Sequence, residues 1–198
     1  MSVSLVTNMS VSLVKGQKIN LSKEIEGLSK VVVGLGWDAA RKGLFGATHD
    51  IDCDASAIVL GTNDSYKGVA YYGERRIKNG CVLHHGDNLT GVGTGDDEQI
   101  TVDLKNMPSD VEKVVFVVNI YGCDSRKQDF GMIKNAFIRL VDASSNKEIC
   151  RYNLSENYSG KTAMVFAEVY KKDNEWRFNA IGQGTTDKSI SEMTRKYK

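Results

Sequence analysis

Short stretches in which apolar and polar residues alternate run through most of the chain, separated by Gly, Asn, Asp and Ser. Alternation with a period of two is typical of strands that bury one face, and the turn residues recur roughly every ten positions. The segment 113–121 is apolar on both faces, so we expect it at the centre of a sheet. Because no long helical pattern separates the strands, the sequence predicts an all-β fold, an antiparallel β-sandwich.

The pattern also predicts a helix at the end of the chain and a short helical turn at 129–133. Ile190, Met193 and Tyr197 share one helical stripe, which indicates a C-terminal amphipathic helix. Two short strands joined by a turn are expected on either side of Lys15-Gly16. The expected strands are 11–13, 19–21, 30–37, 55–60, 69–72, 81–83, 99–104, 113–121, 136–141, 148–154, 163–170 and 176–181.

The first hexapeptide of the chain occurs twice. Residues 1–6 read Met-Ser-Val-Ser-Leu-Val, and the same six recur as 9–14. Six residues are too few for a structural repeat unit, so we interpret 1–8 as a duplicated extension outside the core. No linker or low-complexity tract divides the remainder, and we predict a single domain over 9–198.

Composition and charge indicate an ordinary soluble protein. Hydrophobic residues make up 41% of the 198 positions and charged residues 26%, and no apolar run approaches the roughly 20 residues of a membrane helix. The net charge of +1 gives no general attraction to nucleic acid or anionic lipid. Four separated cysteines, with no signal peptide before them, favour free thiols in a reducing cytoplasm.

An acidic, glycine-rich stretch is the strongest chemical signal. Residues 86–98 hold four carboxylates and four glycines, with no lysine or arginine among them. Two carboxylates about 5 Å apart repel by roughly 3 kcal/mol at an effective dielectric near 20, so such a loop needs a compensating charge. Its carboxylate, amide and carbonyl oxygens suit Ca²⁺ better than Mg²⁺, although a solvated acidic turn is the alternative. The candidate ligands are Asp87, Asn88, Asp96, Asp97 and Glu98.

A second acidic cluster is formed by Asp50, Asp52 and Asp54. In an extended chain these residues share one face at a spacing of about 6.6 Å, which is costly unless a positive charge lies over them. The spacing is that of an EF-hand loop, but alanine and glycine occupy its sixth and twelfth positions, so we reject that motif. Asp38, at a strand end, is a further candidate ligand and is equally suited to capping a turn.

Other kinds of site are less well supported. His49, His84 and His85 stand next to carboxylates and could hold Zn²⁺ or Mn²⁺. Two acidic clusters could also form a two-metal hydrolase site. The sequence has no nucleophile elbow, phosphate loop or spaced Cys/His pair, so we expect a protein that is not an enzyme. A small-ligand-binding module stays open, although no base or phosphate pocket can be recognised.

Several blocks of residues together resemble a known family. They are 10–13 with Lys15-Gly16, 33–38, 50–56, 84–91, 95–98, 137–140 and 182–184. In this order they are similar to the signature blocks of the TerD domain of tellurite-resistance, general stress and chemical-damage resistance proteins. Val92 and Thr94 stand where many members carry acidic residues, and His85 stands in place of threonine. Two fewer carboxylates imply weaker binding of a cation and also less repulsion among the carboxylates that remain.

The resemblance implies a β-sandwich that binds Ca²⁺ through acidic loops and acts in the cytoplasm as a binding, scaffold or sensor module. It also implies work at the inner face of the membrane through Ter partners, including membrane-associated TerC and TerB. No direct membrane insertion and no nucleic-acid partner are expected. Members are associated with resistance to tellurite, phage and other stress, and some relatives have been described as binders of cyclic nucleotides.

Overall fold

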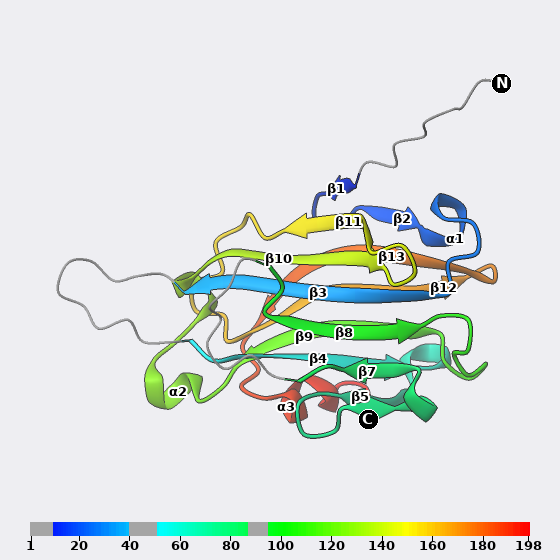
Figure 1. Ribbon diagram of the computed structural model, residues 1–198. Coiled ribbons are helices and arrows are strands. Elements are labelled where there is room, and N and C mark those ends of the chain that lie inside the picture. Colours follow the sequence, from blue (N-terminus) through cyan, green and yellow to red (C-terminus); the bar gives the residue numbers. More distant parts are fainter. Residues whose placement is uncertain (1–9, 40–50, 87–94) are drawn as a thin grey trace.

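The computed structural model describes residues 10–39, 51–86 and 95–198, and its strands form two facing sheets (Figure 1). In spatial order, the first sheet contains β1 (Val11–Leu13), β11 (Lys147–Asn153), β10 (Ile133–Asp142), β3 (Lys30–Ala39), β8 (Glu98–Asp103), β7 (Val82–His84) and β6 (Arg76–Ile77). The second contains β2 (Lys18–Asn20), β13 (Glu175–Thr185), β12 (Ala163–Lys172), β9 (Lys113–Ile120), β4 (Cys53–Leu60) and β5 (Tyr66–Ala70). The predicted sandwich is confirmed, and all the described strand pairs are antiparallel except β1 with β11.

Strand β9 lies inside the second sheet, between β12 and β4, as its doubly apolar pattern predicts. Val114, Phe116 and Val118 point into the main core between the two sheets. Val115 and Val117 belong to a second apolar cluster on the outer face of the same sheet. Both faces of β9 are therefore buried, which explains why its sequence does not alternate.

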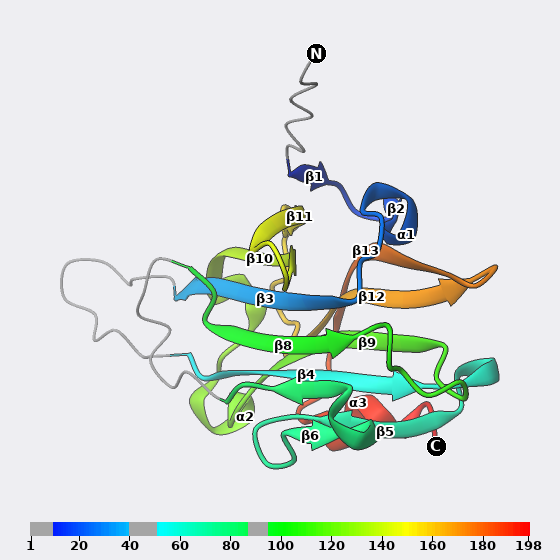
Figure 2. The same ribbon diagram turned by 45° about the vertical axis from the view of Figure 1, so that its right-hand side comes forward.

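The helices are short. They are α1 (Leu21–Glu24), α2 (Cys123–Arg126) and α3 (Ile190–Arg195), with 3-10 turns η1 (Thr62–Asp64), η2 (Lys78–Gly80) and η3 (Phe130–Met132). The stripe predicted for the C-terminal helix is confirmed, because Met193 is buried in the second cluster and Ile190 and Tyr197 pack against it. Helix α3 lies across the molecule from β1 (Figure 2). No helix in the described parts of the chain is both long and apolar enough to cross a membrane.

The two N-terminal strands form where the alternation predicts, but they belong to different sheets. Strand β1 pairs with β11, whereas β2 pairs with β13. The turn between them is held to β13, because Gly16 N donates to Ala180 O at 2.7 Å and Ala180 N donates to Gln17 O at 3.0 Å. Alternation decides which face of a strand is buried and says nothing about its partner, so this arrangement could not be deduced. The extension 1–8 lies outside the described residues.

Candidate functional site

Six of the nine candidate ligands lie at one end of the sandwich, where β3 ends and β4 and β8 begin, on the left in Figure 1. We call this region the acidic end, and it is defined by Asp38, Asp52, Asp54, Asp96, Asp97 and Glu98. The other three candidates, Asp50, Asp87 and Asn88, lie outside the described residues. Three separate segments of the chain thus bring carboxylates to one end of the fold.

Asp97 is buried at the junction of β3 and β8. Its backbone N–H donates to Leu35 O at 2.7 Å, and its Oδ2 accepts a hydrogen bond from Trp37 N at 2.7 Å. Burial raises the pKa of Asp97, the hydrogen bond from Trp37 opposes this, and the carboxylates of Asp38 and Asp96 raise it further. A negative charge at this position is therefore penalised unless a positive charge comes close.

Glu98 and His84 lie between the two sheets and connect them. Glu98 Oε2 accepts from Ala55 N at 2.9 Å and lies 3.1 Å from His84 Nε2. The same ring nitrogen is 3.1 Å from Ala55 O, while His84 Nδ1 accepts from Gly86 N at 3.0 Å. Because both ring nitrogens are engaged, His84 serves in this arrangement as a structural link between β7, β8 and β4.

Asp96 points the other way, onto the outer face of the first sheet. Arg139 of β10 donates from Nε to Asp96 Oδ1 at 2.6 Å and from Nη2 to Oδ2 at 3.0 Å, and Gln99 Nε2 donates to Oδ2 at 3.0 Å. The Asp96 side chain is only 1% exposed. The acidic stretch has no basic residue of its own, but the fold supplies one from a distant strand, and this bidentate pair neutralises Asp96.

Two glycines of β3 make this arrangement possible. A Cβ at Gly34 would collide with the Asp96 carboxylate, and a Cβ at Gly36 would collide with the Phe137 ring and lie 2.8 Å from Gly95 O. The segment that contains Asp96 therefore crosses directly over β3, at a distance that only glycine permits. Sequence reasoning missed both the crossing and Arg139, although two glycines inside a buried strand were the available signal.

The remaining carboxylates of the acidic end are Asp38, Asp52 and Asp54. Asp38 is exposed and accepts from Asn135 Nδ2 at 2.8 Å. Asp52 Oδ2 lies 3.9 Å from Arg126 Nη1, and Asp54 is buried on β4. Burial raises the pKa of the nearby Cys53 thiol, and the carboxylates of Asp54, Glu98, Asp52 and Asp97 raise it further. All four cysteines are free, as predicted, and the structure shows that they are also buried.

The donor chemistry of the acidic end suits calcium, which binds carboxylate and amide oxygens. Within 10–39, 51–86 and 95–198, however, no three His, Cys, Asp or Glu side chains come together closely enough to hold a metal ion. Any complete set of protein ligands therefore has to include donors beyond the described carboxylates.

Comparison with known proteins identifies the family. The TerD domain model matches residues 9–197. The stress response protein SCP2 of Bacillus subtilis is 49% identical over 96% of this chain and all of its own length, and the tellurium resistance protein TerD of Serratia marcescens is 44% identical over 89% and 91%. A Streptomyces coelicolor A3(2) structure described as a homologue of telluride resistance protein has the same fold, with a TM-score of 0.67 and 20% identity over 87% of this chain and 99% of its own. This chain belongs to the TerD domain family.

Proposed function

We propose that this protein is a calcium-binding stress-response module that acts by binding, as a scaffold or sensor, and not by catalysis. The observation that carries the proposal is the position of Asp97. Its carboxylate is buried beside the like charges of Asp38 and Asp96, and among the described residues its hydrogen-bond donor is a backbone N–H. A divalent cation supplies the charge that this environment lacks.

The described contacts divide the candidate residues by role. Asp38, Asp52 and Asp97 would act as ligands, together with Asp50, Asp54, Asp87 and Asn88. Asp96 is committed to Arg139, and Glu98 is committed to Ala55 N and His84, so these two position the strands that carry the ligands. When bound, Ca²⁺ would offset the repulsion among carboxylates that burial makes expensive.

The names of the relatives support a role in stress and tellurium resistance. We extend the proposal to a cytoplasmic protein whose calcium-bound form is recognised by other Ter proteins, including membrane-associated TerC and TerB. If the protein is a binding module of this kind, the bound ion changes the stability of the folded protein, and no substrate has to be turned over.

Saturating Ca²⁺ is expected to raise the melting temperature of the metal-stripped protein by about 5 to 10 °C. A ligand at 100 times its dissociation constant adds about 2.7 kcal/mol to the free energy of unfolding, which corresponds to this shift in a domain of about 200 residues. The measurement is differential scanning calorimetry with CaCl₂, compared with MgCl₂, ZnCl₂ and NaCl at matched ionic strength.

An unchanged melting temperature in millimolar Ca²⁺ would contradict calcium binding. An equal shift with Mg²⁺ would remove the preference for calcium, and a shift with Zn²⁺ alone would replace calcium with a transition metal.

A further inference from the structure

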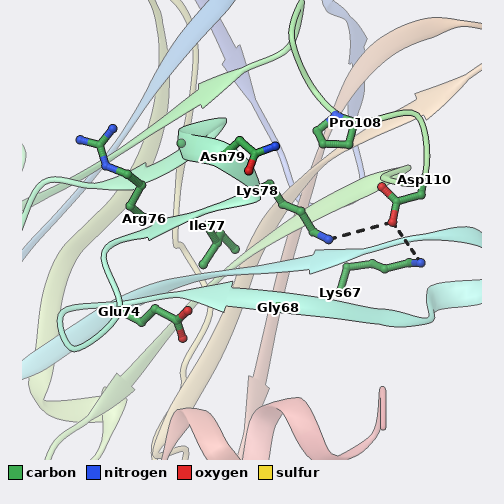
Figure 3. A pocket seen from close by; sticks show the side chains of 10 residues that line it. Lys67, Gly68, Glu74, Arg76, Ile77, Lys78, Asn79, Pro108 and Asp110 are labelled. Atoms are coloured by element: carbon green, nitrogen blue, oxygen red, sulfur yellow. Dashed lines mark ion pairs between the residues drawn. The ribbon is translucent and has the colours of Figure 1, made fainter.

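A second candidate binding site lies at the end of the sandwich opposite to the acidic end. An open pocket of about 660 Å³ is bounded by β5, β6, η2 and the segment that joins β8 to β9 (Figure 3). Pockets for small molecules are typically about 300–1,000 Å³, so this one is large enough for a metabolite. No residue that defines the acidic end lines it.

Two lysines of this pocket converge on one carboxylate oxygen. Lys67 Nζ lies 3.1 Å from Asp110 Oδ2, and Lys78 Nζ lies 4.0 Å from the same atom (Figure 3). The lysine side chains are only 31% and 21% exposed, whereas that of Asp110 is 52% exposed. Two partly buried ammonium groups therefore repel each other and share the exposed Asp110 carboxylate as counter-charge, whereas Glu74, the other carboxylate of the lining, lies away from both lysines (Figure 3).

Local structure constrains the backbone segments that carry both lysines. A Cβ at Gly61 would lie 2.5 Å from Asp110 O and 2.6 Å from Lys67 Cε, so this glycine allows the lysine stem and the Asp110 backbone to pack together. Lys78 and Asn79 have φ angles of 51° and 54°, a left-handed conformation that residues other than glycine seldom adopt. The backbone segments that carry the two lysines are thus constrained by local structure, which lowers the cost of ordering them when a ligand binds.

The other walls of the pocket favour a ligand with a small carbon skeleton. Ile77 and Pro108 provide apolar surface beside the two lysines, and Arg76 lies at the margin (Figure 3).

Asp110 is ionised at neutral pH. A hydrogen bond from Lys67 is the main reason that the pKa of Asp110 lies below its ordinary value, so this carboxylate is an anion between the two lysines.

We propose that this pocket binds a small phosphomonoester, whose phosphate replaces the Asp110 carboxylate between Lys67 and Lys78 while its carbon skeleton contacts Ile77 and Pro108. A phosphomonoester dianion brings two charges and three terminal oxygens, whereas Asp110 offers the lysines one charge and one oxygen. A carboxylate ligand would only repeat what Asp110 already supplies. Because Asp110 is exposed, water screens its ion pairs with the lysines and displacing it costs little.

The test is calorimetric titration of the calcium-free protein with glycerol phosphate, and with inorganic phosphate, at fixed ionic strength. The double variant Lys67→Met/Lys78→Met is expected to bind glycerol phosphate about tenfold more weakly or worse, because charge-assisted hydrogen bonds are lost. Asp110→Asn is expected to bind it several-fold more tightly, because the internal competitor loses its charge. Lys113→Met is the matched control, since Lys113 is also a partly buried, ion-paired lysine but does not line the pocket.

Absence of binding at millimolar glycerol phosphate overturns the proposal, as does equal binding by the double variant and the original protein. Weaker binding by Asp110→Asn, whose substituted side chain is exposed and does not endanger folding, overturns the displacement of Asp110. Cosedimentation with vesicles that contain phosphatidic acid identifies the source: lysine-dependent sedimentation assigns the phosphate to a lipid headgroup, and lysine-dependent binding of glycerol phosphate alone assigns it to a soluble metabolite.

Discussion

Replacing Gly34 with alanine is expected to lower the free energy of unfolding by about 3 kcal/mol. The new methyl group would occupy the space of the Asp96 carboxylate. That carboxylate would have to leave Arg139, and breaking a buried ion pair in this way typically costs about 3–5 kcal/mol. We place the effect at the lower end because Arg139 is partly exposed. Urea denaturation followed by circular dichroism measures the change.

A double-mutant cycle provides the control for this prediction. In a protein that already carries Asp96→Ala, the Gly34→Ala substitution should cost much less, because the colliding carboxylate is gone. Gly36→Ala is the matched substitution on the same strand, and Asp96→Ala should not relieve it, since a methyl group at Gly36 meets Phe137. Additive effects of Gly34→Ala and Asp96→Ala would contradict the close approach inferred at this position.

Asp96→Asn and Asp97→Asn are expected to have opposite effects in metal-free protein at neutral pH. Asp96→Asn removes the charge that Arg139 binds through two hydrogen bonds, and should cost about 2–3 kcal/mol with or without Ca²⁺. Asp97→Asn keeps an oxygen for the Trp37 N–H and removes a disfavoured charge, so the metal-free variant should be at least as stable as the original protein. Its stabilisation by Ca²⁺ should shrink or vanish.

The direction of the stability change expected for Asp97→Asn follows from the raised pKa of Asp97 in the folded protein. Protonated Asp97 favours the folded state below the pKa of the unfolded chain, and this contribution is lost as the pH rises through the higher folded value. Asparagine carries no charge at any pH, so the variant does not lose stability in this way as the pH rises. Thermal melts of both variants, with and without Ca²⁺, measure the four stabilities. Equal calcium stabilisation of Asp97→Asn and the original protein would exclude Asp97 as a ligand.

Much of the fold could be predicted because the sequence of each strand indicates which of its faces is buried. Alternation located most strands, the doubly apolar segment 113–121 indicated a central strand, and the spacing of Ile190 and Met193 indicated the C-terminal helix. The strand expected at 69–72 lies instead at Tyr66–Ala70, and the two-residue strand β6 was not expected. Strand partners could not be predicted, because pairing depends on residues far away in the chain. The assignment of β1 and β2 to different sheets therefore became known only from the structure.

At the acidic end, too, the contacts of single residues could not be predicted from the local sequence. Asp96, Asp97 and Glu98 are consecutive, and the sequence treats them as one group of oxygen donors. In the folded protein Asp96 binds Arg139 on the outer face, Asp97 accepts from Trp37 N, and Glu98 lies between the sheets. The chain bends at Gly95 and Asp97 before β8 begins at Glu98, so the three side chains point in different directions and adjacency in sequence does not imply a shared site.

The placement of β1 and β2 also constrains the order in which the protein can fold during its synthesis. These strands are among the first segments to leave the ribosome, yet their partners β11 and β13 are among the last. Contacts between residues so far apart in sequence form slowly, because a long loop must close before the pairing contributes any stability. Until residue 175 has been made, β2 has no strand to join, and an edge of the growing second sheet stays open. The first sheet has all its strands once residue 153 has been made, whereas the second sheet must wait for β13. The second sheet therefore keeps an open edge for longest, and such an edge can pair with other chains and lead to aggregation.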